Sequence, residues 1–144
     1  MSAGNRRSGR AYALQLLYAR DGDVSGDVGR DAASWASEFE LEVDAQAQQF
    51  ARELVAAAVE RSAEIDQLIV SASKNWRLDR MSRVDRNILR LGTCELVMFK
   101  DVPLKVVINE AVELAKRFGT AESSAFVNGV LDRIATAVGR GPED

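Results

Sequence analysis

The residues best suited to chemistry are three arginines near the start of the chain: Arg6, Arg7 and Arg10. They precede an apolar face with helical spacing, which contains Ala11, Leu14, Leu17 and Tyr18. Positive charge at the start of a helix is disfavoured by the helix dipole, while guanidinium groups bind phosphate oxygens through two parallel hydrogen bonds. The cluster therefore has two interpretations, an arginine clamp for phosphates or a solubilising, charged helix tip.

Enzyme chemistry is poorly supported by the composition. The chain has no histidine and one cysteine, Cys94, which excludes imidazole catalysis, Ser-His-Asp and Cys-His sites and the commonest zinc sites. It has no glycine-rich phosphate loop. Glu110 and Glu113 stand beside Lys116 and Arg117, a pattern typical of surface ion pairs on a helix. We therefore expect neither an enzyme nor a bound cofactor or metal.

The charges are strongly segregated along the sequence. Residues 1–20 contain four arginines and no acid, residues 21–66 contain twelve acids and three bases, and residues 67–144 contain twelve bases and ten acids. The formal net charge is −3. Because the local potential at a contact face matters more than this total, a polyanionic partner is not excluded.

Size and apolar content indicate a cytoplasmic globular protein. A chain of 144 residues is long enough to bury a core, as one domain or two small subdomains. Cys94 lies in the apolar run 91–99, which predicts a reduced core residue. No apolar run reaches the length of a membrane span, and no hydrophobic signal core follows the first charges.

The periodicity predicts an all-helical protein without strands. We expect an N-terminal helix from Arg6, after a start that is disordered until something binds it, and a loop over 21–30. The further helices are expected over 31–39, 44–73 (capped by Asp44), 82–100 (capped by Ser82), 103–118 and 123–138. The linker over 74–82 then separates an N-terminal helical subdomain, 1–75, from a C-terminal one, 76–144.

The last two predicted helices contain asparagine and glycine residues, which are unusual beside the apolar face of a helix or within it. Asn109 and Asn128 stand beside the apolar stripes of the two helices. Gly119 is expected to close the first helix in a left-handed conformation. Gly129 is expected to let another helix approach closely.

Four segments carry a resemblance to a known family: R-x-x-A-L-Q-L-L-Y in 10–18, VDRNILRLGTCEL in 84–96, DVPLKVVINEAVELAKRFG in 101–119 and FVNGVLD in 126–132. Their order and spacing resemble those of the NusB family of bacterial transcription antitermination factors. The resemblance covers nearly the whole chain, and the variable part is roughly 21–48.

The resemblance implies an all-helical fold of two packed helical subdomains and a non-catalytic function. Members of the family bind the boxA element of ribosomal RNA leader transcripts together with the small ribosomal subunit protein NusE, and load an antitermination complex on RNA polymerase. A homodimer with its RNA face covered, as some members form, is an alternative, as is a general structural interaction module.

The resemblance also implies binding residues. The residues expected to bind RNA are Arg6, Arg7, Arg10, Tyr18, Lys105, Glu122 and Phe126, and those expected to bind NusE are Tyr18, Asp85, Arg86 and Arg90. At two positions, Ser8 and Ala125, this chain lacks a base that the family often has.

Several of these residues have a structural interpretation as well. The rings of Tyr18 and Phe126 suit the edge of a core, and Glu122 suits the positive end of a helix. Of the residues assigned to NusE, Asp85, Arg86 and Arg90 equally suit helix capping or an ordinary charged surface.

Overall fold

A computed structural model describes residues 3–25, 43–74, 76–142 and 144, and in these residues every regular element is helical. The elements are α1 (Ala3–Ser25), α3 (Ala45–Glu60), α4 (Ser62–Ala72), the 3-10 turn η1 (Leu78–Arg80), α5 (Arg83–Met98), α6 (Leu104–Phe118) and α7 (Ser123–Ala137). The predicted all-helical fold class is confirmed. None of the described helices combines the length and apolar character needed to cross a bilayer.

The chain divides into two compact units, residues 1–56 and 57–144. The sequence predicts a division after residue 75 instead. The observed division lies earlier because α4 packs against α5 and α7 and so belongs with the C-terminal helices.

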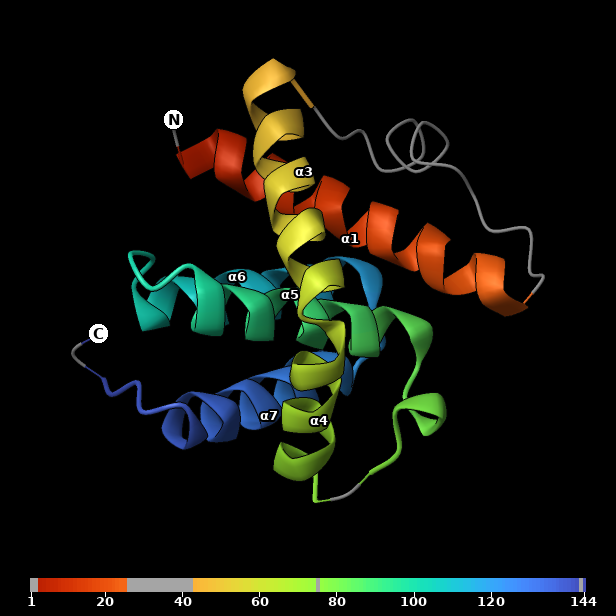
Figure 1. The fold of residues 1–144 in the computed structure, drawn as a ribbon, viewed down its shortest axis with the longest axis vertical. Coiled ribbons are helices and arrows are strands. Elements are labelled where there is room, and N and C mark those ends of the chain that lie inside the picture. The colour runs from red at the N-terminus through yellow and green to blue at the C-terminus, as the bar shows by residue number, and fades with distance from the viewer. Residues whose placement is uncertain (1–2, 26–42, 75, 143) are drawn as a thin grey trace. The chain divides into compact units, whose positions relative to one another are not determined.

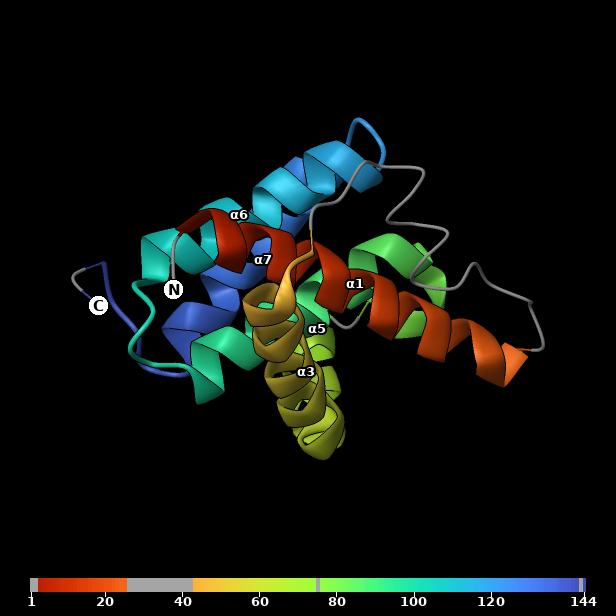
Figure 2. The same ribbon diagram turned by 90° about the horizontal axis from the view of Figure 1, so that it is seen from above.

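In the first unit, α1 and α3 cross closely (Figure 2). Gly9 permits this approach, because a Cβ atom there would lie 2.7 Å from Cδ2 of Phe50 and 3.0 Å from the carbonyl oxygen of Ala47. The predicted cap of α3 is confirmed: the Ala47 N–H donates to Oδ1 of Asp44 over 2.8 Å.

The extent of α1 differs from the prediction at both ends. The helix begins at Ala3 and continues to Ser25, so the expected disorder is wrong for residues 3–5 and the expected loop is wrong for residues 21–25. Glycine and aspartate cost only up to about 1 kcal/mol each in a helix, an amount that context overrides. The rest of that loop, 26–30, and the helix predicted over 31–39 lie outside the described residues.

In the second unit, α5, α6 and α7 pack pairwise, and α4 packs on α5 and α7 (Figure 1). The close approach occurs at Gly92 of α5, where a Cβ atom would lie 2.8 Å from Cδ1 of Leu131. At Gly129 a Cβ atom would meet only the Arg133 guanidinium, 3.6 Å away, so the close approach expected there is wrong. The buried core of this unit includes Ile65, Ile69, Ile88, Leu91, Leu96, Val107, Leu114, Val130 and Ile134.

One predicted helix cap in this unit is confirmed, whereas one predicted continuous helix and one predicted backbone conformation are wrong. Oγ of Ser82 accepts the Asp85 N–H over 3.0 Å, which confirms the predicted cap of α5. The helix predicted over 44–73 is interrupted at Arg61, whose φ of −104° and ψ of 21° depart from helical values. Gly119 is extended (φ −100°, ψ −163°), not left-handed. Glycine is needed there because a Cβ atom would lie 2.6 Å from Cβ of Ser123.

The C-terminal segment folds back onto the start of α6. Gly139 makes the turn with a φ of 81°, a conformation that favours glycine. Buried Arg140 then donates from Nη2 to the Val102 carbonyl over 2.7 Å, and the Leu104 N–H donates to the Asp144 carbonyl over 2.9 Å. These bonds place the segment beside α6 and α7.

Candidate functional site

The first candidate group is the set of cations at the start of α1. The first turn of this helix contains no acidic residue. Arg6 is half-buried, and its Nε is a buried donor without an acceptor in the described part of the chain, while Arg7 is exposed. Because the Arg6 Nε is enclosed by the protein, an external anion would meet the accessible remainder of the Arg6 side chain and the exposed Arg7.

Arg10 is placed differently from its two neighbours. Its side chain is 3 % exposed, and its guanidinium carbon lies 5.5 Å from the centroid of the Phe50 ring on α3. This is a cation–π arrangement, so Arg10 packs α1 against α3. Of the three arginines predicted to bind phosphate, two therefore have accessible surface and one is part of the packing.

The aromatic and acidic residues predicted to bind RNA lie on two helices. Tyr18, on α1, and Phe126, in the first turn of α7, are both half-buried. Glu122 precedes α7 and is exposed, with its Oε2 accepting from Oγ1 of Thr120 over 3.2 Å. Its side chain does not cap the helix.

The residues predicted to bind a protein partner lie on α5. Asp85 is half-buried, and its Oδ1 is a buried acceptor without a donor among the described residues. Arg86 donates from Nη1 to the Met81 carbonyl over 3.2 Å. Asp85 therefore keeps unused hydrogen-bonding capacity at the start of α5.

Arg90 binds within the unit instead. Its Nε and Nη2 donate to the two carboxylate oxygens of Asp66 on α4, over 2.9 and 3.2 Å. Its Nη1 donates to Oδ1 of Asn87 over 3.1 Å. A bidentate pair of this kind joins α4 to α5.

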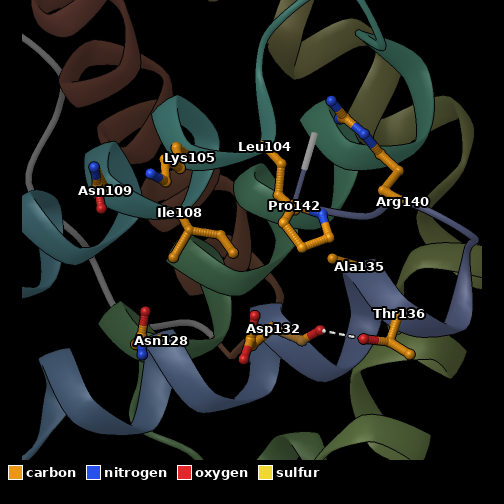
Figure 3. Close-up of a pocket in the computed structure, with 10 residues that line it drawn as sticks. All are labelled: Leu104, Lys105, Ile108, Asn109, Asn128, Asp132, Ala135, Thr136, Arg140 and Pro142. Carbon is orange, nitrogen blue, oxygen red and sulfur yellow. Dashed lines mark hydrogen bonds between the residues drawn. The ribbon is translucent and has the colours of Figure 1, made fainter. Parts of the chain in front are cut away.

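A pocket of about 310 Å³ lies between α6, α7 and the C-terminal segment (Figure 3). Its apolar lining comes from Leu104, Ile108, Ala135 and Pro142, and its polar lining includes Lys105, Asn109, Asn128, Asp132 and Thr136. Lys105, predicted to bind RNA, thus lines a pocket together with Asn128, Asp132 and Thr136 of α7. Glu122 and Phe126 are not among the residues that line it.

Asn109 and Asn128 stand out in the sequence as polar residues beside apolar stripes, but the sequence does not predict the pocket that they line. Asn128, Asp132 and Thr136 follow one another at intervals of four, so they form a polar stripe on α7. The polar stripe on α7 can be recognised in the sequence. Its position opposite Asn109 cannot, because that depends on how α6 and α7 pack against each other.

The described residues contain no group of three or more His, Cys, Asp or Glu side chains placed to hold a metal ion. Cys94 is buried, as predicted for a core residue, and burial raises the pKa of its thiol to about 12. The thiol stays protonated at physiological pH and is a poor nucleophile.

Comparison with known proteins gives one consistent result. The sequence model of the NusB family matches residues 7–136. The chain is 53 % identical to the transcription antitermination protein NusB of Myxococcus xanthus, over 95 % of this chain and 99 % of that protein.

Solved structures agree in fold as well as sequence. NusB of T. maritima superposes with a TM-score of 0.73 and 41 % identity, covering 91 % of this chain and 90 % of the other. A structure of antitermination factors NusB and NusE in complex with dsRNA has a TM-score of 0.74 and 30 % identity, covering 94 % and 99 %.

Proposed function

Because this chain belongs to the NusB family, we propose that it is a non-catalytic, RNA-binding transcription antitermination adaptor that works in the cytoplasm. It binds the boxA element of ribosomal RNA leader transcripts together with NusE, within the antitermination complex on RNA polymerase. The similar structure that contains NusB, NusE and dsRNA supports this assignment of partners.

The observation that carries the RNA assignment is the pair of arginines at the start of α1, whose first turn contains no acid. Arg6 has a buried Nε without an acceptor in the described chain, Arg7 is exposed, and no acid lies in the first turn. The helix dipole adds positive potential at the same end. Phosphate groups supply negative charge and acceptor oxygens, which suit a cationic helix start.

The three arginines have different functions in this proposal. Arg6 and Arg7 bind phosphates directly. Arg10 is a positioning residue, because its contact with Phe50 fixes α1 on α3 and thereby fixes the orientation of the other two side chains. Phe126 and Tyr18 offer accessible ring surface for unstacked bases.

The contact with NusE is proposed to use the start of α5. Asp85 is half-buried, and the accessible part of its side chain could accept a hydrogen bond from a basic or amide side chain of the partner. Arg86 flanks it, while Arg90 supports the surface indirectly by holding α5 on α4. Two moderate contacts on one RNA strengthen each other through effective concentration.

The salt dependence of RNA binding tests this proposal. A boxA-type single-stranded RNA and a scrambled control are titrated with the purified chain at several salt concentrations. Neutralising about three phosphates predicts a slope near −2 for log K against log salt, at about −0.7 per phosphate. A flat response, with equal affinity for both RNAs, would contradict the proposal.

A further inference from the structure

The pocket between α6 and α7 contains polar groups that the fold itself does not use. The side chains of Lys105, Asn109, Asn128 and Asp132 all line it, and none of the four has a hydrogen bond or ion pair within the described part of the chain. Figure 3 shows the Asn128 and Asp132 side chains on α7, with Asn109 and Lys105 across from them on α6. Residues with amide, carboxylate and ammonium groups therefore line one cavity.

The pocket has a fixed apolar surface beneath these groups. Leu104 and Ala135 are buried and Ile108 is half-buried, and all three line the cavity. The hydrogen bond from the Leu104 N–H to the Asp144 carbonyl holds its C-terminal wall in place. A cavity of about 310 Å³ with an apolar surface and a few convergent polar groups is typical of a site for a small planar group.

The donors and acceptors favour one kind of base. The Asp132 carboxylate has two acceptor oxygens and no donor, and the Watson–Crick edge of guanine offers two adjacent donors, N1–H and the N2 amine. Adenine and cytosine place a ring acceptor beside their amine, and uracil has a single N–H between two carbonyls. The side-chain amides of Asn109 and Asn128 can donate to O6 and N7 of guanine.

Lys105 adds a charge at the edge of the same pocket. It is exposed in the first turn of α6, where the helix dipole also favours an anion. A nucleotide whose base enters the pocket would bring its phosphate within the positive potential of this turn.

We propose that this pocket binds one unstacked guanine base of RNA, with Asp132 accepting from its N1–H and N2 amine, Asn109 and Asn128 reading its other edge, and Lys105 binding the phosphate. The inference rests on the proposed RNA-binding function and extends it. It adds a specificity-determining contact in the C-terminal unit to the phosphate contacts of α1.

The test replaces each guanosine of a boxA-type RNA in turn by inosine, which lacks only the N2 amine. At one position, inosine is expected to weaken binding about tenfold, the size of one hydrogen bond to a charged group. Asp132→Asn should weaken binding of the guanosine RNA by a similar factor and abolish the difference between guanosine and inosine.

The matched control is Asp101→Asn, which removes the same charge from an exposed residue outside the pocket. Removing an acid that merely repels phosphate would strengthen binding, so weakening by Asp132→Asn but not by Asp101→Asn supports the proposal. Equal melting temperatures of the two variants would show that folding is unaffected.

Two outcomes would overturn it. If inosine is tolerated everywhere and Asp132→Asn does not weaken binding, while Arg6→Ala with Arg7→Ala does, the guanine site is wrong and the RNA-binding function stands. Displacement of the RNA by micromolar free GMP would assign the pocket to a free nucleotide instead. If the arginine variant also binds normally, the proposed phosphate contacts fail as well.

Discussion

Helices α1 and α5 both carry arginines in their N-terminal halves, and the surroundings of these arginines differ between the two helices. In α5, Asp85 lies in the first turn, Ser82 caps it, and Arg90 forms a bidentate pair with Asp66 of α4. In α1 the first turn contains no acid, and Nε of Arg6 has no acceptor within the described chain.

The difference shows that an arginine-rich helix start has no fixed meaning. Where carboxylates and carbonyls of the same unit complete the hydrogen bonds, the arginine stabilises the fold. Where they are absent, the positive charge at the helix end remains available to an external anion. We therefore propose that Arg6 and Arg7 bind an anion, whereas Arg90 stabilises the fold through its pair with Asp66.

The largest expected effect is on the α1 side of this comparison. Arg6→Ala combined with Arg7→Ala should weaken boxA RNA binding about 100-fold at low salt, from the loss of two charge-assisted hydrogen bonds. The melting temperature should not change. Fluorescence anisotropy with labelled RNA measures the affinity. The control is Arg52→Ala on α3, an exposed arginine that hydrogen-bonds to Gln48. An equal loss with this variant would contradict the assignment.

Arg90→Ala tests the α5 side. The side chains of Arg90 and Asp66 are 22 % and 29 % exposed, so solvent weakens the pair, and we expect a loss of about 2 kcal/mol in the free energy of unfolding. RNA affinity should be unchanged. Urea unfolding measures the first quantity, with exposed Arg80→Ala as the control. Normal stability combined with impaired RNA binding would reverse the comparison.

Arg10 lies between the two cases, because it belongs to α1 but is buried. Arg10→Ala should lower the free energy of unfolding by about 1.5 kcal/mol, through the lost cation–π contact and packing with Phe50. Its effect on RNA affinity should be smaller than that of the Arg6 and Arg7 double variant. An RNA defect without any loss of stability would make Arg10 a direct phosphate ligand.

The smallest effect concerns Cys94 in the interior of α5. Its pKa rises from 9.0 to about 12 in the folded protein, so above pH 9 the unfolded chain loses the thiol proton while the folded chain keeps it. The contribution of Cys94 to the free energy of unfolding should therefore be constant below pH 8, and it should lower that free energy by about 0.8 kcal/mol at pH 9.5. Comparing urea unfolding with Cys94→Ala isolates this contribution. An identical pH dependence in both proteins would refute it.

Local features of the fold could be predicted from the sequence, and features that depend on packing could not. The caps at Asp44 and Ser82 act within a single turn, and both are confirmed. The break between α3 and α4 at Arg61 could not be predicted, because no glycine or proline lies at that position in the sequence. The close contact at Gly92 depends on Leu131 of another helix, so nothing near Gly92 in the sequence distinguishes it from Gly129.

The candidate site shows the same limit. Residue type and position single out Arg6, Arg7 and Arg10, but only the structure shows Arg10 against Phe50 and Arg90 against Asp66. The pocket needs the pairing of α6 with α7 as well as the turn at Gly139. Its residues come from three segments, and no single stretch of sequence contains the pattern.

Whether the chain is an RNA-binding adaptor that acts with NusE is decided by its affinity for boxA RNA and for a scrambled RNA, each measured with and without NusE. We predict tighter binding to boxA, strengthened further by NusE and weakened by Arg6→Ala with Arg7→Ala. Equal, weak binding to both RNAs with no effect of NusE would contradict this prediction, and the arginines of α1 would then be only a charged helix tip.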